Sequence, residues 1–327
     1  MITYFFRKRI PGQNSIEELF YGIIEQLKNT LPVQHVEVPE KSASPRGLWK
    51  NIRFARKNQT GINHITGDVH YLAMGLGKNT VLTLHDIGSG LKGSWWKRIY
   101  FRIFWLTIPA YKAARITVIS NTSKNEVLRW VPFAKDKIRV IYNPYRQELL
   151  NHQKSTVPEK EIETVLLMGT KSNKNLERAF EALKGLNIQL IVVGKLTEEQ
   201  QFIIRDLKLN VEEKSNLSFQ EVIQVYLKTD LLFFPSLYEG FGMPIIEAQV
   251  LGVPVITSNT GAMKEVAGEG AHLVNPYSVA ELREALQKVM DSSEYRQHLV
   301  AKGKENVKRF EPGKIAEQYM EVYRELP

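Results

Sequence analysis

Short apolar runs alternate with helical patterns along the whole chain, and this alternation restricts the fold more than any other feature. The runs at 1–6, 79–86, 163–169 and 231–236 are predicted to be strands, and the continuous apolar run at 231–236 is typical of a strand buried on both faces. Helical patterns separate these runs, and strands that alternate with helices imply right-handed crossovers and parallel sheets. The sequence therefore predicts an α/β protein.

The same alternation starts again after a polar segment at 146–162, whose Pro, Lys and Glu content is typical of a linker. We therefore predict two Rossmann-like, doubly wound parallel-sheet domains, at 1–150 and 151–313. Ligands of such sheets bind beyond the carboxyl ends of the strands. His85, Gly169 and Glu239 fall at the carboxyl ends of predicted strands, and we expect them to face one interdomain cleft.

The charge of the chain is unevenly distributed. Residues 1–150 hold 23 Lys and Arg against 10 Asp and Glu, whereas residues 151–327 hold 21 against 25. Such an asymmetry suggests that the first half meets something anionic. Nucleic acid, an acidic membrane surface and a phosphorylated acceptor all remain open from charge alone.

The 327 residues include no cysteine, which excludes disulfides, thiol catalysis and thiolate metal sites. The first twelve residues, MITYFFRKRIPG, do not have the order of charged and apolar residues of a signal peptide. No stretch approaches the roughly 20 apolar residues that span a bilayer. We expect a cytoplasmic protein, with peripheral contact at the inner face of the membrane as an open alternative.

A glycine turn follows the apolar run at 231–236. Gly240 and Gly242 permit tight backbone angles and the close approach of a ligand. Pro244 suits the first turn of a helix, and Gly252 is typical of a helix end. The sequence therefore predicts a strand, a glycine turn and a helix whose unpaired N–H groups attract phosphate.

Two carboxylates flank this turn, because Glu239 precedes the predicted helix and Glu247 lies on its expected first turn. Carboxylates would repel a phosphate unless they bind another group. Ionised carboxylates only accept hydrogen bonds, and sugar hydroxyls donate them. The pair therefore indicates a ligand that carries both phosphate and sugar.

The second half closely resembles the retaining glycosyltransferases of family 4, which have the GT-B architecture. The matching segments are GTKSNKNLERAF, PSLYEGFGMPIIEAQVLGVPVITSNTGAMKEVAG and AHLVNPYSVAELREAL. The first half matches more loosely, through VLTLHD, ARITVISNTSKNEV and IRVIYNP. The resemblance implies transfer of a hexose from a nucleotide diphosphate sugar, with no metal and no other cofactor. It also implies that a last helix, at 314–327, packs back on the first domain.

The resemblance implies roles for individual residues. Lys174 would neutralise the diphosphate, Glu239 and His85 would contact the transferred sugar, and Glu247 would accept hydrogen bonds from the ribose hydroxyls. Catalysis is thus expected from His85, Lys174 and Glu239. Binding of the donor is expected from these positions: Gly12, Gly169, Thr170, Lys171, Lys174, Ser215, Asn216, Glu239, Gly240, Phe241, Gly242, Met243, Pro244 and Glu247.

The chain departs from the family pattern at three places. Arginines common in the family are replaced by Thr170 and Asn173, so Lys171 is the candidate for the second positive charge. The first loop has only Gly12 where relatives are often glycine-rich, and no glycine precedes the base-binding segment at 214–217. These departures leave the donor base and sugar open, with GDP-mannose and UDP-hexoses both compatible.

The segment from Trp95 to Trp105 mixes aromatic and basic side chains at helical spacing. It either lies at a membrane interface or packs its aromatics inward and leaves its charges in water, and we favour packing. Two other classes of function compete with the transferase. One is a catalytically inactive nucleotide-binding relative or partner subunit, and the other, disfavoured by the absence of a recognised motif, is a nucleic-acid binder.

Overall fold

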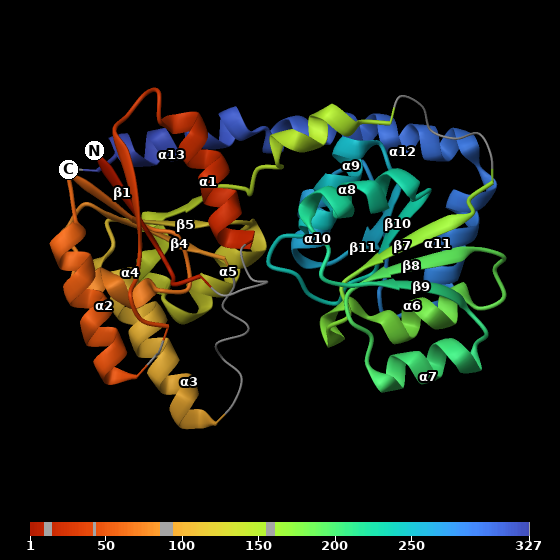
Figure 1. Cartoon of the computed structure of the whole chain (residues 1–327), viewed down its shortest axis with the longest axis horizontal. Helices are drawn as coiled ribbons and strands as arrows, with labels where there is room; N and C mark the ends of the chain where they lie inside the picture. The colour runs from red at the N-terminus through yellow and green to blue at the C-terminus, as the bar shows by residue number, and fades with distance from the viewer. Residues whose placement is uncertain (10–14, 42–43, 86–93, 155–160, 327) are drawn as a thin grey trace. The chain divides into compact units, whose positions relative to one another are not determined.

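The computed structural model describes all residues except 10–14, 42–43, 86–93, 155–160 and 327. It divides the chain into two compact units, Met1–Pro144 with Glu311–Pro327, and Tyr145–Phe310 (Figure 1). Each unit contains a six-stranded sheet whose neighbouring strands are parallel. The predicted α/β architecture with two parallel sheets is therefore confirmed.

The first sheet has the strand order β2-β1-β3-β4-β5-β6. Its strands are β1 (Ile2–Phe6), β2 (Val33–Glu37), β3 (Ile62–Ile65), β4 (Thr80–Leu84), β5 (Arg115–Val118) and β6 (Ile138–Val140). Its helices are α1 (Ser15–Leu27), α2 (Pro45–Asn58), α3 (Trp95–Phe101), α4 (Ile108–Lys112), α5 (Asn121–Trp130) and α13 (Pro312–Arg324). Strands β1 and β4 are buried at every residue, which matches their mostly apolar sequences.

The last helix, α13, packs on α1 in the first unit (Figure 1). The hydroxyl of Tyr323 lies 2.7 Å from that of Tyr4 and 2.6 Å from Nδ1 of His64. Burial lowers the pKa of His64 to about 3, so this imidazole is neutral at physiological pH. His64 is thus a satisfied histidine of the core.

The second sheet has the order β12-β11-β10-β7-β8-β9. Its strands are β7 (Thr164–Met168), β8 (Gln189–Val193), β9 (Asn210–Lys214), β10 (Leu231–Phe234), β11 (Val255–Ser258) and β12 (His272–Val274). Its helices are α6 (Leu176–Leu183), α7 (Glu198–Asp206), α8 (Phe219–Lys228), α9 (Met243–Leu251), α10 (Gly261–Ala267), α11 (Val279–Asp291) and α12 (Ser293–Asn306). Capping boxes start α7 at Thr197 and α8 at Ser218, where Gln200 and Glu221 complete them.

The apolar pattern does not predict three of the elements. Helix α2 carries five cationic side chains, and β9 reads NVEEK, so neither shows an apolar run. Both β9 and the three-residue β12 are edge strands, which are commonly short or charged. The apolar pattern therefore misses both edge strands of the second sheet.

The expected inward packing of the aromatic segment at 95–105 is right for Trp105 and wrong for its first two residues. The ring of Trp105 lies 4.9 Å from that of Tyr71, whereas Trp95 and Trp96 are 57% and 67% exposed. The helix changes to a π-helical segment at Arg102–Thr107 between α3 and α4. Trp105 lies in this segment, and the two exposed tryptophans lie in α3.

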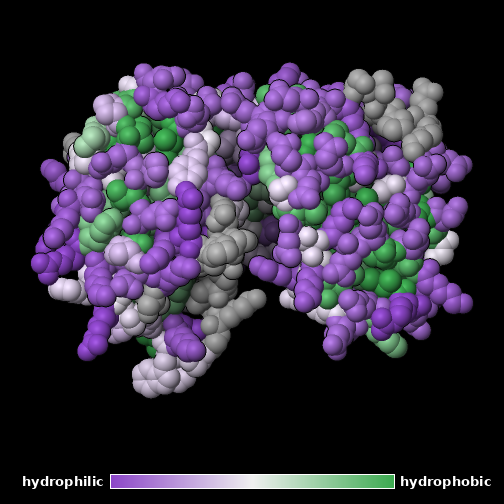
Figure 2. Space-filling model, in the orientation of Figure 1, coloured by the Kyte–Doolittle hydropathy of each residue, from purple (hydrophilic) through white to green (hydrophobic). Residues whose placement is uncertain are grey.

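Hydrophilic residues cover most of the surface turned to the viewer (Figure 2). Among the described residues, no helix combines the length and the apolar character that crossing a membrane requires.

Candidate active site

The second sheet reverses its strand order between β7 and β10, and this reversal defines the candidate donor site. In open α/β sheets, ligands bind outside the carboxyl ends of the strands at such a switch point. The segment after β7 carries Lys174 in a short 3₁₀ turn, Ser172–Lys174, and the loop after β10 carries Glu239. The topology thus brings these two predicted residues to one place.

Lys174 and Glu239 form an ion pair, with Nζ 2.7 Å from Oε1. The two side chains are only 17% and 16% exposed. The ammonium group also lies 4.6 Å from the centre of the Phe234 ring, within the range of a cation–π interaction. The cation is therefore held in a fixed position at the switch point.

Two asparagines that flank Lys174 tie its segment to the loop after β10. The Asn173 amide donates to the Tyr238 carbonyl at 2.8 Å and to Glu239 Oε1 at 3.2 Å. Asn175, 1% exposed and left-handed with φ of 60°, donates to the carbonyls of Pro235 and Pro276. Asn173, which stands where relatives often have an arginine, thus orients the Glu239 side chain.

Glycines allow the close approach of these segments. Gly169 has a φ of 90°, and a Cβ atom there would lie 2.6 Å from Cε of Lys174. Gly194, at the end of β8, has a φ of 134°, and a Cβ atom would lie 2.9 Å from Thr170. Sequence reasoning found Gly169 and missed Gly194, although a glycine directly after an apolar run was the available signal.

The predicted helix after the glycine turn is present as α9. Gly242 forms its N-cap with a φ of 111°, Met243 and Pro244 begin it, and Gly252 ends it with a φ of 76°. Phe241 is 4% exposed and packs edge-on against another phenylalanine ring, so the turn is anchored beside Gly240. The start of α9 carries the positive end of the helix dipole, which favours an anion.

Glu247 lies in the second turn of α9, since no acidic residue occupies the first, and its expected place on the first turn is wrong. Its Oε2 atom accepts a hydrogen bond of 2.9 Å from the hydroxyl of the fully buried Tyr226. Burial raises the pKa of Glu247, opposed by this hydrogen bond and by the charge of Arg146. Tyr226, which sequence reasoning missed, thus orients the carboxylate.

The predicted base-binding segment follows β9. Asn216 there has a φ of 57°, a left-handed conformation that asparagine tolerates better than most residues. This asparagine therefore adopts a backbone conformation that glycine favours, in a segment where the family's glycine is absent. Its neighbour Ser215 is exposed, as is Lys171 at the start of the 3₁₀ turn of Lys174.

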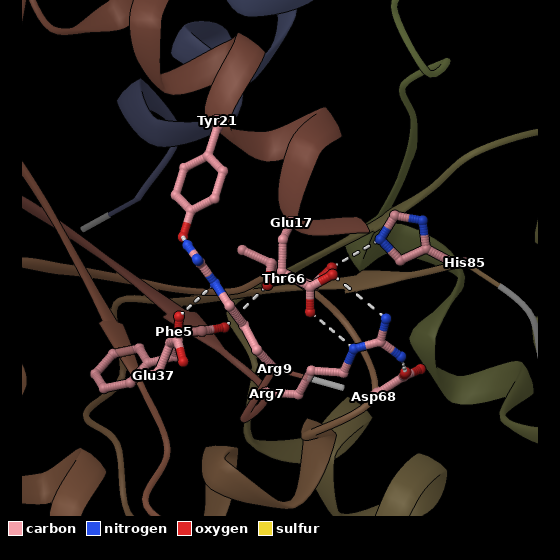
Figure 3. Close-up of polar contacts among 9 residues, drawn as sticks. All are labelled: Phe5, Arg7, Arg9, Glu17, Tyr21, Glu37, Thr66, Asp68 and His85. Atoms are coloured by element: carbon pink, nitrogen blue, oxygen red, sulfur yellow. Dashed lines mark hydrogen bonds and ion pairs between the residues drawn. The ribbon is translucent and has the colours of Figure 1, made fainter. Parts of the chain in front are cut away.

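The remaining predicted residues belong to the first unit. Gly12 lies outside the described residues. His85 directly follows β4, and its Nε2 atom lies 2.7 Å from the Thr66 carbonyl (Figure 3). Because a carbonyl only accepts hydrogen bonds, Nε2 carries the proton. Burial lowers the pKa of His85, so the neutral ring has its acceptor nitrogen at Nδ1.

A charged cluster that sequence reasoning missed lies in the same unit (Figure 3). Arg7, directly after β1, binds both oxygens of the 2% exposed Glu17, at 2.8 and 3.3 Å, and also pairs with Asp68. Asp68 has a φ of 48°, and its carbonyl accepts a 2.6 Å hydrogen bond from the indole of Trp105. Arg7 and Asp68 follow β1 and β3, where the first sheet reverses its order.

Two known protein families match the chain. The family described as Glycosyl transferases group 1 matches residues 148–306, and Glycosyltransferase Family 4 matches residues 25–148. The O-antigen chain mannosyltransferase RfbU of Salmonella typhimurium is 29% identical over 65% of the chain and 61% of its own length. The MMP alpha-(1->4)-mannosyltransferase of Mycolicibacterium hassiacum is 25% identical over 70% of the chain and 59% of its own length.

The chain thus spans about three-fifths of the length of these two relatives. Among solved structures, Anabaena Alr3699/HepE in complex with UDP-glucose is similar, with a TM-score of 0.75 at 18% identity over 99% of each chain. At this identity the likeness concerns the fold alone. The two family matches together cover residues 25–306 without a break, and the chain therefore belongs to the group 1 glycosyltransferases of family 4, with their GT-B fold.

Proposed function

We propose that the chain transfers a hexose from a nucleotide diphosphate sugar to a glycan, lipid-linked or small-molecule acceptor, with retention of configuration. The observation that carries this proposal is the Lys174–Glu239 pair at the switch point of the second sheet, beside the N-terminus of α9. A cation and the positive end of a helix dipole suit a diphosphate, and the carboxylate suits sugar hydroxyls. GDP-mannose and UDP-glucose are the first donors to test, because relatives are named mannosyltransferases and a similar structure contains UDP-glucose.

In this proposal, the bond between the anomeric carbon and the phosphate oxygen breaks as the acceptor oxygen attacks from the face that the phosphate leaves. The departing phosphate takes the acceptor's proton. Lys174 stabilises the negative charge that develops on the diphosphate, which is the role a metal ion has in other transferases. Positioning and charge stabilisation then supply the rate.

A panel of nucleotide sugars tests the donor assignment. Because a ligand specific for the native state raises its melting temperature, GDP-mannose or a UDP-hexose should raise it and also be turned over. Free mannose and glucose serve as controls, since they lack the diphosphate that Lys174 would bind. A protein stabilised by a nucleotide sugar but inactive with every acceptor would favour the non-catalytic relative instead.

We assign the acceptor to the switch point of the first sheet, where Asp68 is 52% exposed and is oriented by Arg7. A carboxylate there is suited to accept a hydrogen bond from the acceptor's hydroxyl. Asp68→Asn should raise the acceptor KM about tenfold or more, since hydrogen bonds to charged groups contribute roughly 1.5–3 kcal/mol. Stabilisation by the donor should be unchanged.

The matched control for this substitution is Asp136→Asn, which changes an exposed aspartate in the short helix Pro132–Lys137 of the same unit. Asp136→Asn should change neither the acceptor KM nor the stabilisation by the donor. An unaltered acceptor KM in Asp68→Asn would refute the acceptor assignment and leave the donor site untouched.

A further inference from the structure

Helix α3 presents its apolar side chains to solvent. It has no buried residue, and Trp95, Trp96, Ile99 and the following Ile103 are 57%, 67%, 46% and 39% exposed. At about 100° per residue, these four positions fall within roughly 100° of arc on one helical face. The two indole rings stack with their centres 3.6 Å apart. The stretch is therefore an amphipathic helix whose apolar face is largely exposed to solvent.

Cationic side chains border this face. Arg98 and Arg102 line a small cavity of about 160 Å³ together with Trp95, Ile99 and Trp130. The guanidinium of Arg102 lies 5.3 Å from the centre of the Trp130 ring. Residues 95–112 contain no Asp or Glu. Among the described residues no carboxylate pairs with Arg98 or Arg102, whereas Arg7, Arg115 and Arg139 of the same unit all bind carboxylates.

We propose that α3 lies in the interfacial layer of a membrane that contains anionic lipid. Tryptophans favour the level of the lipid headgroups, and an exposed stripe bordered by cations is typical of helices that lie in the membrane plane. Arg98 and Arg102 would bind lipid phosphates. The exposed isoleucines distinguish this partner from nucleic acid, whose binding sites combine cations with aromatic rings that stack on bases.

This surface goes beyond the proposed transfer reaction and does not depend on it, because binding is measured without any donor or acceptor. The intact protein is sedimented with vesicles of phosphatidylcholine alone and with vesicles of an equimolar mixture of phosphatidylcholine and phosphatidylglycerol. We expect binding to the mixed vesicles that falls as salt rises, because salt screens the arginine contacts. Binding to neutral vesicles should be much weaker.

Two pairs of substitutions test the face itself. Replacing both arginines (Arg98→Gln with Arg102→Gln) should weaken binding to the mixed vesicles about fivefold per arginine. Replacing both tryptophans (Trp95→Ser with Trp96→Ser) should weaken it on the order of tenfold or more. The matched control is Phe202→Ser on α7, which removes an equally exposed ring (62%) from a helix that starts with two glutamates. It should bind like the parent.

Circular dichroism and melting temperature establish that each variant is folded, and these side chains are exposed, so both should match the parent. Equal binding to neutral and mixed vesicles would overturn the proposal. So would parental binding by both the arginine and the tryptophan variants. Binding to single-stranded RNA without binding to either vesicle would assign the face to nucleic acid instead.

Discussion

Lys174→Gln is expected to lower kcat about a hundredfold to a thousandfold, which is the typical loss when one preorganised donor to a developing charge is removed. The structure supplies the reason, because Glu239, itself oriented by Asn173, and the Phe234 ring fix the ammonium group at the switch point. A glutamine cannot neutralise a leaving diphosphate. Steady-state kinetics with the donor identified by thermal shift measure the effect.

The control for charge alone is Lys184→Gln, because Lys184 is an exposed cation in the cap that ends α6. It should retain the parental kcat. Glu239 keeps its contact with the Asn173 amide in the Lys174 variant, so we expect the fold to survive, with a melting temperature close to that of the parent. Parental kinetics in Lys174→Gln would refute the assignment of this lysine to the leaving group.

Two glycine substitutions test the position of Lys174 indirectly. Alanine strains both Gly169 and Gly185, whose φ values are 90° and 73°, but only Gly169 has a side chain above it. Gly169→Ala should therefore displace Lys174 and lower kcat, whereas Gly185→Ala, with nothing within 4 Å of the added Cβ, should affect stability alone. Equal kcat in the two variants would show that the position of the lysine does not matter.

The central strands and the glycine turn were predictable because each depends on local sequence. The unbroken burial of β1, β4 and β10 appears in the chain as short, mostly apolar runs, and Gly242 marks a backbone angle that few other residues adopt. The edge strand β9 was not predictable in this way, because its charged residues have the composition of a loop. In the second sheet, local patterns therefore indicate the central strands better than the edges.

The supporting residues of the site were not predictable from local patterns, because each contributes through a partner distant in sequence. Tyr226 reaches Glu247 from another helix, and Arg7 binds Glu17 and also Asp68, which is 61 positions away from Arg7. The sequence identifies Asn173 only as the replacement of an arginine that is common in the family. Its contact with Glu239 depends on two loops meeting. Such contacts follow from the strand order, which the sequence pattern does not specify.

Glu247→Gln is expected to weaken nucleotide binding by about ten- to a hundredfold, because hydrogen bonds from two ribose hydroxyls to a charged acceptor contribute roughly 1.5–3 kcal/mol. Calorimetric titration with UDP and GDP measures the loss. The amide oxygen of glutamine can still accept the hydrogen bond from Tyr226, so the substitution removes the charge and keeps the neighbouring contact.

The raised pKa of Glu247 gives the same substitution an opposite effect on stability. A carboxyl whose pKa is higher in the folded state than in the unfolded state binds its proton more tightly when folded. It therefore lowers stability as the pH rises from the unfolded pKa through the folded pKa, and the penalty persists at neutral pH. Glu247→Gln should accordingly melt at or above the parental temperature at neutral pH while its affinity for nucleotide falls.

Nucleotide binding by the parent should share this titration. Ribose hydroxyls bind the ionised carboxylate, so affinity for nucleotide should weaken as the pH falls through the raised pKa, and Glu247→Gln should lack that step. Glu221→Ala is the contrasting control. Because Glu221 completes the capping box of α8, this variant should lose stability and keep its affinity for nucleotide. A Glu247→Gln variant that loses stability and keeps affinity would make this glutamate a structural residue like Glu221, and the ribose would have to bind elsewhere.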